Sequence, residues 1–218
     1  YPSWYIDRDW NRFPSLYTLY ALHQHAIQYA MIYKPFLNGD QIDDVHNRIA
    51  QFPDQLKYVN TFDEVEVYQL IAPPPSDPPA LRFEFDEFVP GDGWYSPERN
   101  ETGATFAWMQ TPQATLDLPP LTPTKPRVFR AQIYSYADQS LLNALQVTMN
   151  GQPIILNAQQ TDSGLVLQGN IPQAAFAGDT LQIVLETLSY GSPVQRGTGN
   201  DARNLGIAFD WIEISAAN

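Results

Sequence analysis

Two short stretches of the sequence carry residue types that bind sugars. Residues 91–109 contain two Trp and a Tyr among carboxylates and turn-forming residues, and residues 200–206 read Asn-Asp-Ala-Arg-Asn-Leu-Gly. Aromatic rings present flat apolar faces to sugar rings, while carboxylates and guanidinium groups hydrogen-bond to hydroxyls. The sequence therefore predicts a carbohydrate site formed by Trp94, Tyr95, Glu98, Trp108, Asp201 and Arg203.

A structural interpretation of the same residues stays open. Phe106 and Trp108 alternate as core residues of a strand do, and large aromatic side chains with this period are more often core than binding site. Glu98 and Arg203 would then form a buried or half-buried ion pair that locks two loops together. In that case only Trp94 and Tyr95 are left as contacts for a ligand.

The sequence predicts no catalytic residue. Carboxylates that could act in glycoside hydrolysis are present, but their spacing singles out no acid and base: Asp86, Glu87, Asp92, Glu98, Asp210 and Glu213. On a regular strand Asp210 and Glu213 point to opposite faces, so only a bulge would let them pair. No phosphate-binding loop or nucleophile elbow is present.

No cofactor is required by any motif. A zinc site at His23, His25 and His46 would need further ligands that the sequence does not identify, which leaves a structural Ca²⁺ as the possible metal. Turns around Asp92 and Asp201 offer oxygen ligands for a structural Ca²⁺, yet they are equally good ordinary turns. Asn100-Glu101-Thr102 fits the N-glycosylation pattern, which matters only in a eukaryotic secretory context.

Composition excludes several partners. The 218 residues carry 12 basic and 24 acidic side chains, a net charge of −12, and no cluster of Lys and Arg. Nucleic acid and anionic membrane surfaces are therefore poor partners. The absence of Cys excludes disulfides and thiolate metal sites. No apolar run approaches the ~20 residues of a membrane span. Because the chain begins at Tyr1, we expect it to be part of a longer protein.

The first third of the chain predicts a small α/β unit, residues 1–72. Apolar residues at helical spacing follow Pro14, and residues 26–33 form an almost continuous apolar run that predicts a buried strand. A second helix is predicted between the turn at residues 38–40 and Pro53, followed by strands at 56–62 and 65–71. Residues 73–80 are rich in Pro and predict a semi-rigid linker.

Residues 81–218 predict an antiparallel β-sandwich with a jelly-roll-like arrangement. Apolar and polar residues alternate in each of several segments: 82–88, 129–133, 145–149, 165–169, 181–185 and 207–214. Asn150-Gly151 predicts a tight hairpin that returns through residues 154–156. About eight strands separated by turn residues fit a sandwich or jelly roll. The fold class is therefore α+β overall, a small N-terminal α/β unit followed by this sandwich.

Four motifs resemble a known family. Residues 93–98 (Gly-Trp-Tyr-Ser-Pro-Glu), 106–109 (Phe-Ala-Trp-Met), 147–151 and 201–207 resemble the C-terminal soluble region of bacterial membrane glycosyltransferases of the GT-C type and related envelope polysaccharide-biosynthesis proteins. The resemblance implies a sandwich similar to a carbohydrate-binding module. Ala107 departs from the family pattern, in which Arg stands between the two aromatic residues of that strand.

The resemblance implies a non-catalytic accessory domain on the extracytoplasmic face of the bacterial membrane, within a membrane-anchored parent protein. Its implied partners are a polysaccharide or lipid-linked glycan and the membrane domain of the same polypeptide. Two alternatives stay open. A structural or protein-interaction module that caps a membrane domain would expose an apolar patch on the small α/β unit. A stand-alone glycoside-active enzyme would hold two carboxylates ~5–10 Å apart in a cleft.

Overall fold

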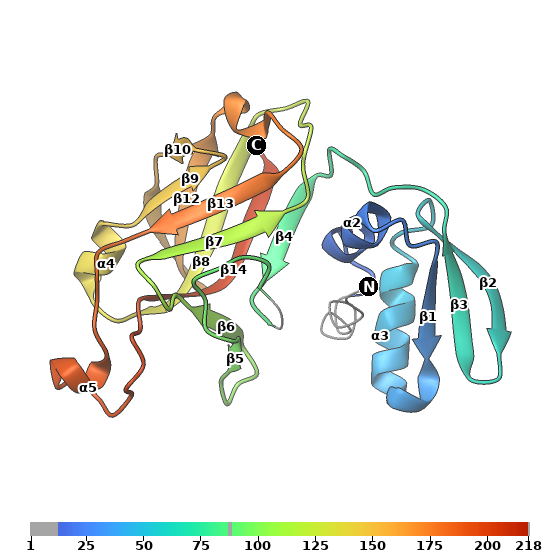
Figure 1. Ribbon diagram of the computed structural model, residues 1–218, viewed down its shortest axis with the longest axis horizontal. Helices are drawn as coiled ribbons and strands as arrows, with labels where there is room; N and C mark the ends of the chain where they lie inside the picture. The colour runs from blue at the N-terminus through green and yellow to red at the C-terminus, as the bar shows by residue number, and fades with distance from the viewer. Residues whose placement is uncertain (1–12, 87–88, 218) are drawn as a thin grey trace. The chain divides into compact units, whose positions relative to one another are not determined.

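The chain forms two compact units, Tyr1–Pro75 and Ser76–Asn218. The structure, a computed structural model, describes residues 13–86 and 89–217 (Figure 1). The first twelve residues of the predicted α/β unit, and Glu87 and Phe88 of the first predicted strand of the sandwich, lie outside the described residues. No helix in the described ranges is long and apolar enough to span a membrane.

The N-terminal unit has the predicted order of helix, strand, helix, strand, strand. Its elements are α2 (Leu16–Gln24), β1 (Tyr29–Tyr33), the short 3-10 helix η2 (Lys34–Phe36), α3 (Gly39–Ile49), β2 (Leu56–Phe62) and β3 (Val65–Leu70). Ser15 caps α2 by accepting a hydrogen bond from the Thr18 N–H at 3.1 Å. Asn38 caps α3 in the same way through the Gln41 N–H at 2.9 Å. These caps satisfy amide groups that have no partner within the helix.

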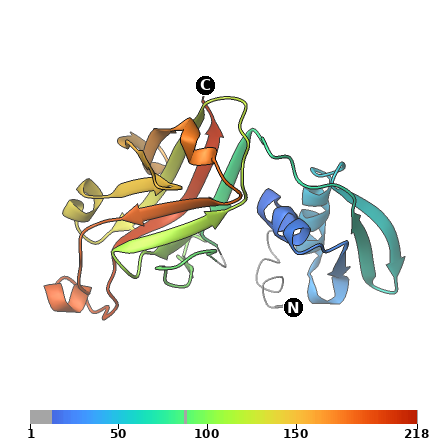
Figure 2. The ribbon, with the colours of Figure 1, turned by 45° about the horizontal axis from the view of Figure 1, so that its top comes forward.

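The three strands pair antiparallel in the order β1-β3-β2, and both helices lie on one side of this sheet (Figures 1 and 2). The core between helices and sheet contains Leu19, Val45, Ile32, Leu56 and Tyr68. The prediction of a buried strand within residues 26–33 was wrong in part, because β1 buries Ile32 while its neighbours Tyr29, Met31 and Tyr33 are exposed. A continuous apolar run indicates a fully buried strand only where layers cover both faces of the sheet. Within this unit the helices cover one face of the sheet.

The second unit is the predicted jelly-roll-like antiparallel sandwich (Figure 2). In the described residues it contains eleven strands: β4 (Ala80–Glu84), β5 (Glu98–Arg99), β6 (Thr105–Trp108), β7 (Gln113–Leu118), β8 (Arg127–Tyr136), β9 (Gln146–Met149), β10 (Gln152–Ile154), β11 (Asn157–Thr161), β12 (Gly164–Ile171), β13 (Leu181–Glu186) and β14 (Ile207–Ala216). The helices α4 (Gln139–Asn143), η3 (Gln173–Phe176) and α5 (Pro193–Arg196) are short connections.

One sheet has the order β10-β9-β13-β7, and the other has the order β11-β12-β8-β14-β6-β5, with β4 also paired to β14. Phe129, Ile183 and Ile212 are completely buried in the core of the sandwich. The hairpin predicted at Asn150-Gly151 joins β9 to β10, and both residues have positive φ, 47° and 75°, as this tight turn requires.

A buried Arg fixes the point where the chain enters the sandwich. Arg127, at the start of β8, is only 4% exposed and donates hydrogen bonds to the carbonyls of Pro78 and Pro79 at 2.7 and 3.0 Å. It also forms an ion pair with Asp77, which accepts two further hydrogen bonds from Thr124. These bonds, first from Thr124 and then from Arg127, lower the pKa of Asp77 to about 2. The second half of the segment predicted as a linker is therefore held to the sandwich.

Candidate functional site

Strand pairing next to β5 and β6 decides which side chains of residues 94–108 point into the core. Trp94 pairs with Met109, the Tyr95 N–H donates to the Trp108 carbonyl at 2.9 Å, and Glu98 pairs with Phe106. Opposed residues of an antiparallel pair share a face, and neighbours along a strand alternate. Trp94 and Met109 therefore face inward, whereas Tyr95, Glu98 and Trp108 belong to the outward face.

Trp94 lies against the core. Its ring centroid is 4.7 Å from that of Phe85 and 5.8 Å from that of Phe209, and both Phe residues are completely buried. The indole N–H donates to the Thr115 carbonyl at 2.7 Å. Trp94 therefore contributes to folding through its ring contacts and its single donor, while its ring stays half-buried. The sequence had favoured it as a contact because a turn surrounds it.

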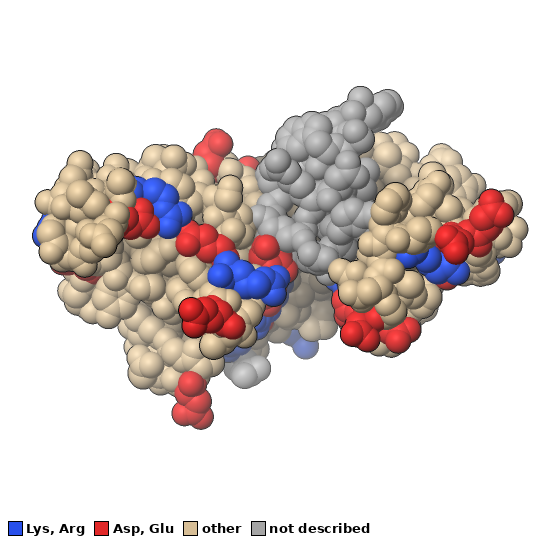
Figure 3. Space-filling view, turned by 90° about the horizontal axis from the view of Figure 1, so that it is seen from below, with Lys and Arg blue, Asp and Glu red and all other residues tan. Residues whose placement is uncertain are grey.

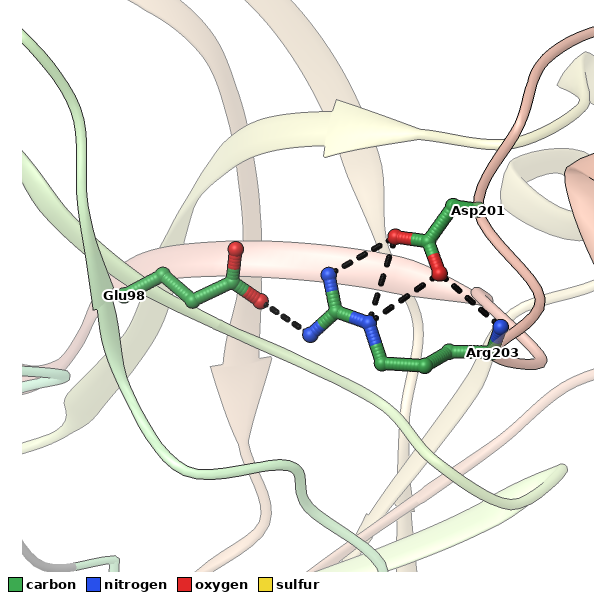
Figure 4. A network of polar contacts seen from close by, with 3 residues as sticks. All are labelled: Glu98, Asp201 and Arg203. Carbon is green, nitrogen blue, oxygen red and sulfur yellow. Dashed lines mark hydrogen bonds and ion pairs between the residues drawn. The ribbon is translucent and has the colours of Figure 1, made fainter.

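Glu98, Asp201 and Arg203 form one polar network on the outward face (Figure 4). Arg203 donates to Glu98 Oε1 at 2.6 Å through Nη1, to Asp201 Oδ2 at 2.8 Å through Nη2, and to both Asp201 oxygens at 3.2 Å through Nε. The side chains are 33–40% exposed, so the predicted half-buried pair between Glu98 and Arg203 is confirmed. These partners, Asp201 first, raise the pKa of Arg203, and the bonds from Arg203 lower the pKa of Asp201.

Tyr95 extends this network with an aromatic ring. The Arg203 guanidinium carbon lies 5.2 Å from the ring centroid of Tyr95, within reach of a cation–π contact. Beneath it, the Tyr190 hydroxyl donates to the Met109 carbonyl at 2.8 Å, and burial raises the pKa of Tyr190. A Cβ on Gly206 would lie 2.6 Å from the Tyr190 ring, so only glycine fits there. Gly206 thus lets the Tyr190 ring lie directly against the backbone of the motif at residues 201–206.

The structure adds an aromatic stack that the sequence did not predict. The rings of Phe106 and Tyr134 are parallel within 6°, with centroids 3.8 Å apart, and Trp108 packs edge-on against Phe106. Phe106 is 7% exposed because Tyr134 covers it, whereas Tyr134 is 38% exposed. Tyr134 is thus the outermost ring of an aromatic row with Phe106 and Trp108. Tyr95 follows on the neighbouring segment, where its N–H donates to the Trp108 carbonyl.

Asn100 holds Tyr134 in place. Its amide nitrogen donates to the Tyr134 hydroxyl at 3.1 Å. Its Oδ1 accepts hydrogen bonds from the Thr102 N–H, the Thr102 hydroxyl and the Ala104 N–H at 2.8–3.0 Å, which fixes the orientation of the amide. Two sequence features could have indicated this contact. One is the Asn-x-Thr pattern, which here forms a turn, and the other is Tyr134 in the alternating segment at the end of β8.

The burial of Ala107 gives a reason why this chain does not have Arg where the GT-C glycosyltransferase pattern has it. Ala107 lies between Phe106 and Trp108, pairs with Phe209 of β14 and is completely buried. An Arg at this inward position would bring an unpaired charge into the core unless the surrounding strands differed. The ion pair of Arg203 with Glu98 forms without it.

The candidate catalytic carboxylates do not single out an acid and a base. Of the candidates, Glu213 lies 3.6 Å from Arg130 and Glu98 lies 2.6 Å from Arg203. Glu84, which was not a candidate, accepts from Arg82 at 2.5 Å. The register of β14 against β8 shifts between Phe209 and Trp211. This is the kind of bulge that the side chains of Asp210 and Glu213 would need in order to lie on the same face. Burial, followed by the nearby charge of Glu84, raises the pKa of Asp210.

Protein contacts hold both turns that were considered for a structural Ca²⁺. Asp201 uses both carboxylate oxygens on Arg203, and the Asp92 backbone is tied to Thr115 by hydrogen bonds of 2.8 and 2.9 Å. Within residues 13–86 and 89–217, no group of three His, Asp or Glu side chains could hold a metal ion. Both turns therefore have a sufficient structural role without a metal.

Comparison with known proteins gives structural similarity without a family. No family model matches the sequence, and no curated protein matches it. The chain is similar to the C-terminal family 6 carbohydrate-binding module of LamC, a marine laminarinase from Zobellia galactanivorans, at 11% identity and a TM-score of 0.34 over 62% of this chain and 98% of that chain.

Two clostridial modules of the same family show a similar degree of likeness. The family 6 module from Clostridium cellulolyticum, solved with xylose, has 10% identity and a TM-score of 0.37, and covers 63% of this chain and 97% of that chain. CsCBM6-3 from Clostridium stercorarium, solved with cellobiose, has 9% identity and a TM-score of 0.36, and covers 65% of this chain and 95% of that chain. At these TM-scores the assignment of a sandwich rests on the strand pairing itself.

Proposed function

We propose that the sandwich is a non-catalytic glycan-binding domain whose contact surface is formed by Tyr134 and Trp108 of the aromatic row and by the neighbouring Tyr95, with Phe106 buried beneath Tyr134. The single observation that carries this proposal is the exposed Tyr134 ring, which Phe106 stacks from beneath and Asn100 orients through its hydroxyl. A fixed, partly exposed ring offers a flat face to a pyranose without loss of rotamer entropy on binding.

The polar network supports the same proposal. Glu98 pairs with Phe106 across β5 and β6, so the carboxylates and guanidinium of the network lie next to the aromatic row. Sugar hydroxyls both donate and accept, and a carboxylate held beside a guanidinium offers both kinds of partner. On the face shown in Figure 3, Lys and Arg lie beside Asp and Glu, which favours a neutral ligand over a polyanion.

The resemblance to GT-C glycosyltransferases supplies finer proposals about context. In this proposal the domain belongs to a membrane-anchored glycosyltransferase-like parent, lies on the extracytoplasmic face of the bacterial membrane, and positions a polysaccharide or lipid-linked glycan beside the membrane domain of the same polypeptide. The full reading frame tests the parent: apolar spans upstream of Tyr1 support it, and their absence contradicts it.

Calorimetric titration of the whole chain with neutral envelope oligosaccharides tests glycan binding. We expect Tyr134→Ala to weaken binding by roughly 5- to 150-fold, taking as a guide the ~1–3 kcal/mol contributed by a base stacked on an aromatic side chain. Tyr58→Ala, which removes a comparably exposed Tyr from the N-terminal unit, should bind as the unmodified chain does. Absence of binding to every neutral glycan would remove the proposal, and equal affinity of Tyr134→Ala would remove the site.

One observation favours an interaction module as a second function. The sheet of the N-terminal unit leaves large apolar side chains exposed on the side away from its helices, among them Met31 at 63% and Phe62 at 60%. This is the apolar patch that a protein-interaction module would carry. The two functions belong to different units and are compatible.

A further inference from the structure

The helix-free face of the N-terminal sheet, here called the open face, is built by strand alternation. Tyr29, Met31 and Tyr33 of β1 pair with Gln69, Val67 and Val65 of β3, and Phe62 of β2 pairs with Val65 from the other side. Paired residues share a face. Ile32, which alternates with them, is in the core against the helices. These side chains therefore form one continuous surface.

The open face is as large as the largest apolar patches found on monomers, which are often functional. Its outer side chains are 46–76% exposed: Tyr29, Met31, Tyr33, Phe36, Phe62 and Ile71. Phe36 joins the surface through its ring contact with Tyr33, at 5.8 Å between centroids. Six half-exposed side chains of this size present roughly 600 Å². That is the upper end of the largest apolar patch on a typical monomer, ~300–600 Å², and most of the ~800 Å² that each partner buries in a standard interface.

Charge favours a second copy of this chain as the occupant. The acidic residues Asp40, Asp43 and Asp44 are on α3, which covers the opposite side of the sheet. On the open face itself the paired strand residues include one charged side chain, Lys57, which lies opposite Gln69. Self-association therefore brings no like-charged carboxylates together across the face, although the whole chain carries −12.

The ends of the open face are electrostatically complementary. Lys57 lies at the Tyr29 end of the sheet, while Asp63 and Glu64 form the turn at the end where Phe62 pairs with Val65. A two-fold axis perpendicular to the strands reverses the second sheet, so that each Lys57 end faces an Asp63-Glu64 end. Closed two-fold pairing is also the commonest arrangement of identical subunits. An anionic membrane would need several Lys or Arg on this face, and it offers one.

We propose that the open face is a homodimer interface, in which the β1-β3-β2 sheets of two chains pack face to face about a two-fold axis. Tyr29, Met31, Tyr33 and Phe62 of both copies form its apolar centre, as in two sheets packed ~10 Å apart. This interface is independent of glycan binding and would give the protein two sandwich sites per particle, with a gain in avidity for a polymeric glycan.

Sedimentation equilibrium of the 218-residue chain between about 1 and about 100 µM tests the proposal. We expect a dimer that Met31→Glu dissociates, with the dissociation constant raised more than tenfold, because a carboxylate is then buried at the centre of the interface. Ile155→Glu, at a 77% exposed position of the sandwich, should leave the dimer intact. Circular dichroism of both variants verifies folding, which a solvent-exposed substitution leaves unchanged.

A mixture of Met31→Glu and Met31→Lys distinguishes two-fold pairing from other assemblies. Each variant alone should be monomeric, and the mixture should form heterodimers. A monomeric parent chain at every concentration would overturn the proposal, as would a dimer unaffected by Met31→Glu. A monomer that binds uncharged phosphatidylcholine vesicles through Met31 would assign the face to a membrane instead and likewise overturn it.

Discussion

Replacement of Trp94 separates the core from the site most sharply. In Trp94→Ala the ring contacts with Phe85 and Phe209 and the hydrogen bond to the Thr115 carbonyl are lost together. Removal of a buried Trp or Phe ring costs ~3–5 kcal/mol, and since Trp94 is half-buried we expect about 3 kcal/mol. In Trp94→Phe most of the packing is kept, so the loss is mainly the hydrogen bond, about 1 kcal/mol.

Thermal unfolding followed by far-ultraviolet circular dichroism measures both changes. At roughly 2–4 °C per kcal/mol for a domain of about this size, Trp94→Ala should lower the midpoint of the sandwich transition by about 6–12 °C and Trp94→Phe by about 2–4 °C. Below these midpoints both variants should bind the glycan as the parent chain does. A Trp94→Ala protein with an unchanged midpoint and no glycan binding would refute the assignment of this ring to the core.

Two further predictions concern charged groups. Arg203→Ala should reduce the free energy of unfolding of the sandwich more than it reduces the free energy of glycan binding, because the guanidinium joins Glu98 and Asp201. Thermal unfolding and calorimetric titration measure the two changes. A variant that unfolds at the parent's temperature yet loses binding would contradict this order. Burial opposes ionisation of Glu66, but bonds from His46 and Tyr68 lower its folded pKa, so its stabilising effect is complete above its unfolded pKa of about 4.3 and is lost as pH falls through the lower folded value. In Glu66→Gln the amide hydrogens of β3 should therefore exchange faster than in the parent chain near neutral pH, and this difference should vanish in acid. A difference in exchange rate that does not depend on pH would contradict the role given to ionised Glu66.

Local signals in the sequence predicted the elements well. Asn38 of the predicted turn at residues 38–40 caps a helix, and Asn150-Gly151 forms a tight hairpin, because these features depend on neighbouring residues alone. The strand β7 was missed, although its Ala114, Leu116 and Leu118 alternate with polar residues. The strands β5 and β11 were also missed, since a two-residue strand or a run such as Asn-Ala-Gln-Gln-Thr has no apolar period. Such strands form because a neighbouring strand offers hydrogen bonds, which is a tertiary effect.

The candidate site was predicted in its chemistry more than in its geometry. The pair of Glu98 with Arg203 followed from opposite charges in two turn-rich motifs, and the structure confirms it. Tyr134 was missed because its stacking on Phe106 joins β8 to β6, strands that are both paired with β14. Sequence alternation alone does not say which of several outward rings will meet.

The alternation along the site strands makes folding and binding hard to separate by mutation. Ala107 and Met109 are completely buried, while the residue between them, Trp108, belongs to the aromatic row, so core and site share one short strand. A shift of pairing by one residue would exchange the two sets. The inward contacts of Trp94 and Met109 therefore hold the register on which Tyr95 and Trp108 depend. Loss of glycan binding assigns a residue to the contact surface only when the variant unfolds at the parent's temperature, and Tyr134, whose ring lies outside this register, is the residue for which that condition is most readily met.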